Sequence, residues 1–439
     1  MNSVFEKINI PAEEIFGNIT LIDKLENANI VWHSSNPDVV SDKDEGFLKA
    51  GVVHRQDRDT KVKLTACVTL QNGEKAEKTF DVTVKAAPKK LGEDDFEGYL
   101  FGHFIGEGSP EGEQIYFAVS KDRLNFTDCS DKPALVSNVG EKGVRDPFIC
   151  RSFEGDRFFL VATDLSIYNR GGWVKNEQGY YDASTTGSSY LVFWESKDLL
   201  NWTEPRLINV APQNAGMAWA PEIVYYEKTG EYVIFFASSI MDLKTKYKAK
   251  PNAIYYVTTR DFVHFSDTRL FIDNQTDNSE KAREIIDTTV LKIGDYYYSV
   301  SKDGDNAEAN GGIRILRTDD LLDCSSWEKV LDLDELGLDL SSVKVSALDN
   351  SMLEGPELFR FNRKDWEDKD VPEYGIITDQ YAVGAGYLPI ITKDIEDRTN
   401  AKGSWKLLSD KDYSFDRLKK RHGTICAITK DEIERLLNK

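Results

Sequence analysis

Five stretches of the chain share one pattern, in which a polar or charged tip precedes an apolar run. The stretches are Arg145-Asp146-Pro147-Phe148-Ile149, Ala220-Pro221-Glu222-Ile223-Val224, Ile286-Asp287-Thr288-Thr289-Val290, Glu354-Gly355-Pro356-Glu357-Leu358 and Arg421-His422-Gly423-Thr424-Ile425. They recur roughly every 65 to 76 residues, which is typical of repeat architectures that return one point of each unit to a common centre. Carboxylates that crowd one centre shift each other's pKa values and can divide the roles of general acid and base. Asp146, Asp287 and Glu354 are therefore the candidate catalytic residues.

A second series of turn motifs supports a count of five units. Each turn follows an apolar strand and contains an Asp that can accept backbone hydrogen bonds: residues 120–126, 196–202, 259–265, 318–322 and 392–395. Middle strands are expected between the two series, at residues 158–163, 232–237, 296–301 and 374–378. This order predicts an all-β fold, a five-bladed β-propeller, in which strands near residues 99–106 and 115–119 complete the blade begun by residues 424–429.

The length of 439 residues favours a large domain with a smaller one attached. Residues 1–88 contain short β-patterned runs around the strong hairpin signal Asn72-Gly73 and are predicted to form a small immunoglobulin-like β-sandwich. Residues 89–96 are polar and are interpreted as a linker, and residues 97–439 as the propeller that carries the catalytic site.

A formal net charge of −20 and a pI of about 4.8 disfavour nucleic acid and anionic membranes as partners. The same acidity disfavours a strongly anionic substrate, unless a basic pocket acts locally. Five scattered cysteines are typical of a reducing compartment, and the N-terminus has no apolar signal-peptide region. We therefore expect a cytoplasmic protein, although a secreted chain that had lost its signal peptide would look the same. The oligomeric state is left open.

The N-terminal stretch from Val31 to Val40 resembles the atrophied bacterial immunoglobulin-like domain. Residues 96–429 resemble glycoside hydrolase family 43, through Val144-Arg145-Asp146-Pro147, Trp219-Ala220-Pro221-Glu222-Ile223, Ile286-Asp287, Leu353-Glu354-Gly355-Pro356 and Arg421-His422-Gly423. The resemblance implies a five-bladed propeller that hydrolyses arabinofuranosides or xylosides with inversion of configuration.

By position, the resemblance implies that Asp146 is the general base that activates water and that Glu354 is the general acid. Asp287 would be the carboxylate that orients Glu354 and keeps it protonated. Inversion requires the acid and base to be separated by roughly 6.5 to 9.5 Å, so that a water fits beside the sugar. Two positions depart from the usual pattern, because Thr288 stands where many relatives have Pro and Gly355 stands where some have Ala.

The remaining candidates surround the predicted mouth of the propeller. The candidate substrate-binding residues are Arg145, Trp173, Trp219, Glu222, Gln380 and Arg421, with Tyr381 and residues 384–387 close by. His422 resembles the histidine that holds an axial calcium ion in some family members, although a single His is a sparse calcium site, since Ca²⁺ prefers several oxygens. No cofactor is expected to be required, and a structural Ca²⁺ at the axis is the alternative to a His that only donates hydrogen bonds.

Three functions compete. The first is an exo-acting inverting glycosidase that releases L-arabinofuranose from plant-derived arabinan or arabinoxylan oligosaccharides, with β-xylosidase or β-galactofuranosidase activity as the alternative. The second is a retaining fructan-active propeller, but the Trp-x-Asn-Asp-Pro-Asn and Glu-Cys motifs of that class are not in the sequence. The third is a non-catalytic sugar-binding propeller, which would have no need for three carboxylates in this register. The sequence leaves the released sugar and exo or endo action open.

Overall fold

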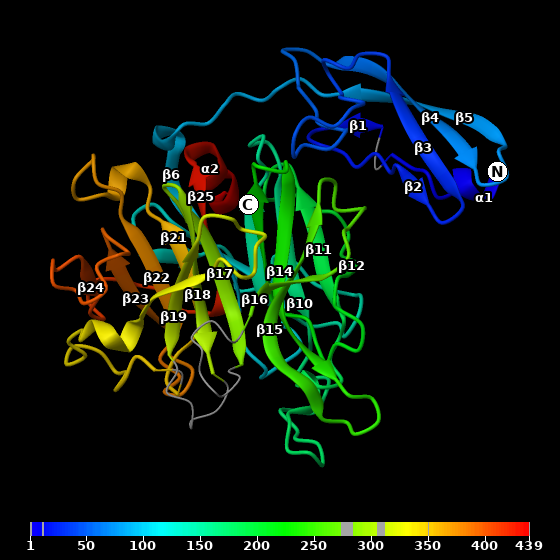
Figure 1. Ribbon diagram of the computed structural model, residues 1–439. Coiled ribbons are helices and arrows are strands. Elements are labelled where there is room, and N and C mark those ends of the chain that lie inside the picture. The colour runs from blue at the N-terminus through cyan, green and yellow to red at the C-terminus, as the bar shows by residue number, and fades with distance from the viewer. Residues whose placement is uncertain (1, 11–12, 274–283, 305–311, 350, 439) are drawn as a thin grey trace.

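The computed structural model describes residues 2–10, 13–273, 284–304, 312–349 and 351–438. Within these residues, five four-stranded antiparallel sheets form the blades of a β-propeller (Figure 1). Blade 1 contains β9 (Val144–Arg151), β10 (Phe158–Asp164), β11 (Tyr190–Ser196) and β12 (Arg206–Asn209), and blade 2 contains β13 (Trp219–Tyr226), β14 (Glu231–Met241), β15 (Lys248–Thr259) and β16 (Arg269–Ile272). Blade 3 contains β17 (Ile285–Ile293), β18 (Tyr296–Asp303), β19 (Ile313–Thr318) and β20 (Glu328–Asp332), and blade 4 contains β21 (Glu354–Arg360), β22 (Tyr374–Asp379), β23 (Tyr387–Thr392) and β24 (Trp405–Leu407).

Blade 5 closes the ring with strands from both ends of the propeller sequence. Its order is β25 (Arg421–Thr429), β6 (Phe96–Phe104), β7 (Tyr116–Ser120) and β8 (Phe126–Asp128). Arg421 pairs with Phe104 and Thr429 with Phe96, as the permuted motif order predicts. The short helix α2 (Lys430–Leu437) follows β25 and packs on β6 through Ile433. The prediction of an all-β five-bladed propeller is confirmed.

Apolar clusters fill the spaces between neighbouring blades. The five clusters lie between blades 5 and 1, 1 and 2, 2 and 3, 3 and 4, and 4 and 5, and they are represented by Leu160, Phe236, Phe271, Ile376 and Phe101. Both faces of the middle strands are therefore covered. This explains why a strand such as β10 is one unbroken buried run rather than an alternation of apolar and polar residues.

A separate five-stranded sheet forms the N-terminal domain, with the order β1-β5-β4-β3-β2. Its strands are β1 (Glu14–Ile15), β2 (Lys24–Leu25), β3 (Ala28–Ser34), β4 (Thr60–Leu70) and β5 (Lys75–Val84), after the one-turn helix α1 (Asn2–Phe5). Gly73, at a positive φ of 85°, lies in the β4–β5 turn predicted by Asn72-Gly73. Irregular chain carrying Val39 and Val40 covers the apolar face of the sheet.

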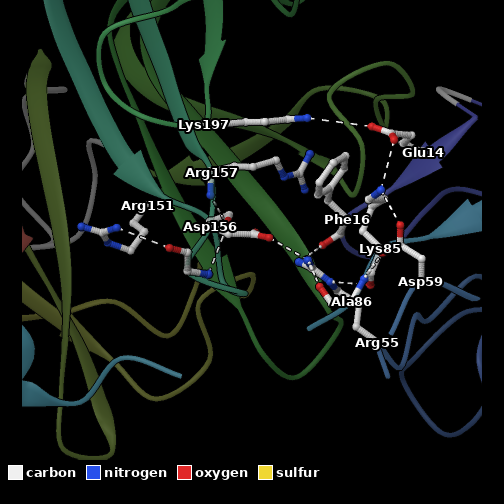
Figure 2. Close-up of polar contacts among 12 residues, drawn as sticks. Glu14, Phe16, Arg55, Asp59, Lys85, Ala86, Arg151, Asp156, Arg157 and Lys197 are labelled. Atoms are coloured by element: carbon white, nitrogen blue, oxygen red, sulfur yellow. Dashed lines mark hydrogen bonds and ion pairs between the residues drawn. The ribbon is translucent and has the colours of Figure 1, made fainter. Parts of the chain in front are cut away.

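This domain contacts the end of blades 1 and 2 that lies away from the starts of the inner strands. Arg55 pairs with Asp156 of the β9–β10 turn (2.7 Å), and Asn18 donates to the carbonyl of Gly230 in the β13–β14 turn (3.0 Å). Figure 2 shows Arg55 and Lys197 converging on Phe16, with their cations 5.6 and 4.2 Å from the ring centroid. The two domains are therefore joined by direct polar contacts as well as by the linker.

Within the described residues, no helix has the length and apolar character needed to cross a bilayer.

Candidate active site

Every inner strand of the propeller starts with a β-bulge. The pairing with the second strand slips near residues 145–147, 219–222, 286–288, 354–357 and 421–424. At the bulge, Asp146, Ala220, Asp287 and Gly355 all have a positive φ, between 47° and 53°. A bulge in this conformation turns the tip residue out of the regular strand direction. The repeated distortion is thus the device that turns side chains from separate blades toward one axis.

Asp146 is held as a carboxylate at the centre of this arrangement. The hydroxyl of Thr163 donates to its Oδ2 (2.8 Å), and Nδ1 of His422 lies 3.4 Å from its Oδ1. Burial opposes ionisation, but the hydrogen bond and charge of His422, with smaller effects of Arg145 and Thr163, hold the pKa of Asp146 below its usual range. An ionised, directed carboxylate of this kind is suited to accept a proton from water.

Asp287 connects the third and fourth blades. Its Oδ2 accepts the amide hydrogen of Gly355 (3.0 Å), and its Oδ1 lies 3.9 Å from Nδ1 of His422. Burial, with repulsion from Glu354 and Asp146, outweighs the attraction of His422 and raises the pKa of Asp287 to about 6. Through the Gly355 amide, Asp287 fixes the backbone next to Glu354, so it can orient that side chain.

Glu354 lies between two cations. Its Oε1 accepts from Arg421 (2.7 Å), and Nζ of Lys302 lies 3.4 Å from its Oε2. About a fifth of the Glu354 side chain is exposed, more than for Asp146 or Asp287. Glu354 is therefore the catalytic candidate with the most direct access to the mouth.

Gly355 is required at its position by the imidazole beside it. Its φ is 53°, and a Cβ placed there would lie 2.8 Å from Cγ of His422. An Ala, which some members of the resembled family have here, would collide with the ring in this conformation. The departure at Gly355 therefore accompanies the close approach of His422.

An arginine and glutamate network surrounds the catalytic candidates. Glu107, in the β6–β7 connection, accepts from Arg145 (2.6 Å) and lies 3.7 Å from Arg421. Arg421 is also paired with the buried Asp379 of β22. Sequence reasoning found the two arginines but missed Glu107, Lys302 and Asp379. None of the three lies in a tip motif, although Lys302 and Asp379 directly follow predicted middle strands.

The side chains enclose a pocket of about 890 Å³ at this end of the axis. Its floor contains Asp146, Asp287, Glu354, Arg421 and His422, while the wall includes the predicted residues Arg145, Trp173, Trp219 and Tyr381. Pockets of about 300 to 1,000 Å³ typically take small organic ligands. The structure therefore brings all three catalytic candidates into one ligand-sized space.

Two predicted substrate-binding residues lie outside the pocket lining. Gln380 is 2% exposed and donates to the carbonyl of Gly386 (3.2 Å). Glu222 is 4% exposed and forms a buried carboxyl pair with Glu357. Neither side chain therefore faces the pocket.

The pair Glu222–Glu357 belongs to a second layer below the pocket. Glu222, Thr289, Glu357 and Thr424 occupy the same place in four successive tip motifs, two residues after Ala220, Asp287, Gly355 and His422. Glu357 Oε1 accepts from the hydroxyl of Thr424 (2.9 Å) and the amide of Ile425 (3.0 Å). Burial and mutual repulsion raise the pKa of Glu222 well above its usual value, and burial raises that of Glu357 to about 7. One shared proton therefore keeps this layer from carrying two adjacent charges.

His422 lies beside the carboxylates of Asp146 and Asp287. Burial alone would lower its pKa, but Asp287 and Asp146 raise it to about 9, so the ring is an imidazolium with both nitrogens protonated at neutral pH. Among the described residues, no group of three or more His, Cys, Asp and Glu side chains could hold a metal ion. The calcium hypothesis at His422 stays a prediction.

Comparison with known proteins identifies the family to which the propeller belongs. Residues 94–434 match the model of a family related to glycoside hydrolase family 43 and described as "Probable glycosyl hydrolase domain". The chain belongs to this family. Its propeller is a domain of the family 43 type, and residues 7–87 match the atrophied bacterial Ig domain, as the sequence indicated.

The chain is 28% identical over 428 residues to an alpha-L-arabinofuranosidase of Bifidobacterium longum subsp. longum. That alignment covers 88% of this chain but 38% of the relative, so the chain spans well under half of it. Among solved structures, it is similar to an endo-1,4-beta-xylanase of Bacteroides thetaiotaomicron (13% identity, TM-score 0.45, covering 74% of this chain and 92% of the other). It is also similar to an alpha-L-arabinanase of Cellvibrio cellulosa (14%, 0.41, covering 76% and 96%).

Proposed function

We propose that this glycoside hydrolase is an exo-acting, inverting α-L-arabinofuranosidase that acts on plant-derived arabinan or arabinoxylan oligosaccharides. The observation that carries the mechanism is the convergence of Asp146, Asp287 and Glu354, from three blades, on the floor of one pocket. Two carboxyl groups with separate roles are what glycoside hydrolysis requires.

In the proposed reaction, Asp146 accepts a proton from a water that attacks the anomeric carbon. Its lowered pKa keeps it ionised, and Thr163 and His422 fix its direction. Glu354 donates a proton to the oxygen of the leaving sugar, and the bond between that oxygen and the anomeric carbon breaks. Asp287 acts as a positioning residue, because it fixes the backbone of Gly355 next to the acid.

The choice of sugar rests on the arabinofuranosidase from Bifidobacterium longum, which aligns with 88% of this chain. A β-xylosidase or β-galactofuranosidase is the alternative, since one fold of this kind serves several sugars. The exo assignment is supported by the wall of loops around the floor, which includes Trp173 and Tyr181.

The test is hydrolysis of 4-nitrophenyl α-L-arabinofuranoside, β-D-xyloside and β-D-galactofuranoside by the wild type and by Glu354→Gln. We expect the arabinofuranoside to be cleaved, and removal of the acid or base typically costs a factor of about 10² to 10⁴. Because an activated nitrophenolate leaves with little acid assistance, we expect the full loss in Asp146→Asn, which removes the base, and a smaller loss in Glu354→Gln. Activity that survives both substitutions would refute the assignment of these carboxylates.

The stereochemical outcome is tested separately by ¹H NMR of the first product formed. Inversion releases the β-anomer of arabinofuranose before mutarotation, whereas retention releases the α-anomer. The pH profile of kcat/KM should be bell-shaped, because one carboxyl must be ionised and the other protonated. A flat profile between pH 5 and 9 would contradict the proposed acid–base pair.

A further inference from the structure

The pocket extends well beyond the catalytic floor along one wall. Within the described residues, this wall includes Trp173, Lys175, Gln178, Tyr180 and Tyr181, all from the β10–β11 connection, and Lys248 at the start of β15. A volume of about 890 Å³ is near the upper end of typical small-ligand pockets. There is thus room for more of the substrate than the one sugar that is released.

This wall is a folded element. Lys175 and Tyr181 pair as an antiparallel bridge, and the amide of Asn176 donates to the carbonyl of Tyr180 (2.8 Å). The side-chain oxygen of Asn176 accepts from the amides of Gln178 and Tyr180 (both 3.1 Å). A small hairpin of this kind can present side chains at fixed positions to a ligand.

Aromatic rings are exposed along this wall although they contact one another. Trp173 and Tyr181 are each 43% exposed, with ring centroids 5.4 Å apart. Tyr247, 53% exposed, lies 6.3 Å from Tyr180 and extends the row onto the β14–β15 hairpin. Exposed rings beside a pocket provide flat apolar faces with polar edges, which suits the faces and hydroxyl groups of sugars.

Exposed lysines lie on this wall and on the hairpin next to it, in a chain with an overall charge of −20. Lys175 is exposed in the pocket lining, with its Nζ 5.1 Å from the Tyr181 ring. The neighbouring β14–β15 hairpin, residues 241–250, carries the exposed Lys244, Lys246 and Lys250, which lie outside the pocket lining. Within the described residues, none of these four lysines has an ion pair. Lysines left uncompensated beside a site in an acidic protein raise the local concentration of anionic ligands.

We propose that this wall binds the part of the substrate beyond the released sugar, and that it selects a neighbouring sugar with a carboxylate, as in a uronic acid. The proposal rests on the exo-acting function proposed above. Trp173 and Tyr181 would stack on the sugar ring while Lys175 pairs with its carboxylate. The net charge of the chain disfavours an anionic substrate unless a basic site acts locally. Lys175 would provide such a site, in the part of the pocket that holds the leaving group.

The test compares an arabinoxylan oligosaccharide that carries glucuronic acid near the scissile bond with the same oligosaccharide after chemical reduction of the carboxyl group. We expect a roughly two- to fivefold higher kcat/KM for the acidic form at low salt, because an exposed ion pair contributes modestly. The preference should disappear in 0.5 M NaCl, where screening is strong. In Lys175→Gln, the ratio of acidic to reduced substrate should fall toward one, whereas the exposed Lys61→Gln of the N-terminal sheet should keep the wild-type ratio.

Equal cleavage of both forms by the wild type, or an unchanged ratio in Lys175→Gln, would overturn this inference and leave the proposed function standing. Release of arabinose from neither form would instead count against the proposed function. In that case the binding of both forms to Glu354→Gln, measured by titration calorimetry, decides the matter. Tighter, salt-sensitive binding of the acidic form supports the charged wall, and equal binding refutes it.

Discussion

Replacing Arg55 by methionine should uncouple the N-terminal domain from the propeller. The Arg55 side chain is 7% exposed and pairs with Asp156, which is 23% exposed (2.7 Å). It also donates to the carbonyls of Phe16 (3.0 Å) and Lys85 (3.1 Å). In Arg55→Met these acceptors and the carboxylate keep their buried positions but lose their donor (Figure 2).

The magnitude follows from burial. Removing one partner of a buried pair costs about 3 to 5 kcal/mol, and the partial exposure of Asp156 places the expected cost near the lower value. If both domains unfold together, a loss of about 3 kcal/mol lowers the Tm of a chain this long by only a few degrees. If the small domain unfolds alone, the same loss lowers its own Tm by roughly 12 to 24 °C.

Differential scanning calorimetry distinguishes these cases. We expect one main transition in the wild type and a separate, earlier transition of the N-terminal domain in Arg55→Met. The matched control is Lys197→Met at the same interface, because Lys197 approaches Glu14 at 4.0 Å with both side chains more than half exposed. An exposed pair contributes about 0 to 1 kcal/mol. If the two variants gave the same thermogram, the inference that burial makes Arg55 the stronger contact would be refuted.

Three further outcomes are expected. Thr163→Val removes the hydroxyl that donates to Asp146, so the pKa of Asp146 should rise. The acid limb of the pH profile of kcat/KM should then move up by about one to two pH units, whereas Thr163→Ser should keep the wild-type limb. Because the pKa values of Glu222 and Glu357 are raised by folding, the folded state holds more protons, and the wild type should lose stability as pH rises from 5 to 8. Glu222→Gln should flatten this loss in urea titrations, whereas Glu222→Ala should cost about 2 to 4 kcal/mol by leaving Glu357 without its partner. Exhaustive EDTA treatment should leave activity unchanged, since the imidazolium of His422 does not offer a lone pair, and a loss restored by Ca²⁺ would contradict this account.

The sequence predicted the fold and the clustering of the three candidate carboxylates because both depend on a repeat. Asp146, Asp287 and Glu354 open inner strands, and any propeller brings those openings to one axis. The bulges that turn these side chains inward were not predicted, since Asp146 and Asp287 adopt a positive φ that no local motif demands. In contrast, the Asn72-Gly73 turn depends on neighbouring residues alone and was predicted directly.

Residues outside the repeat could not be found by counting motifs. Glu107 and Lys302 reach the site from a connection and a second strand, so only the assembled ring places them beside Arg145 and Glu354. Glu222 was predicted to bind substrate because it lies in a tip motif. Its position is two residues beyond the bulge, however, and there the side chain faces the buried layer below the pocket. Membership of a tip motif therefore does not by itself give the depth of a side chain along the axis.

Ring closure also determines when the candidate active site can be completed during synthesis. Arg421 and His422 are carried by β25, which pairs with β6 from the other end of the propeller sequence. A nascent chain that lacks β25 has neither the partner of Glu354 nor the imidazolium between Asp146 and Asp287. Contacts between segments so distant in sequence form late in folding. Of the five inner strands, β25 is synthesised last, and its pairing with β6 thus completes the candidate active site.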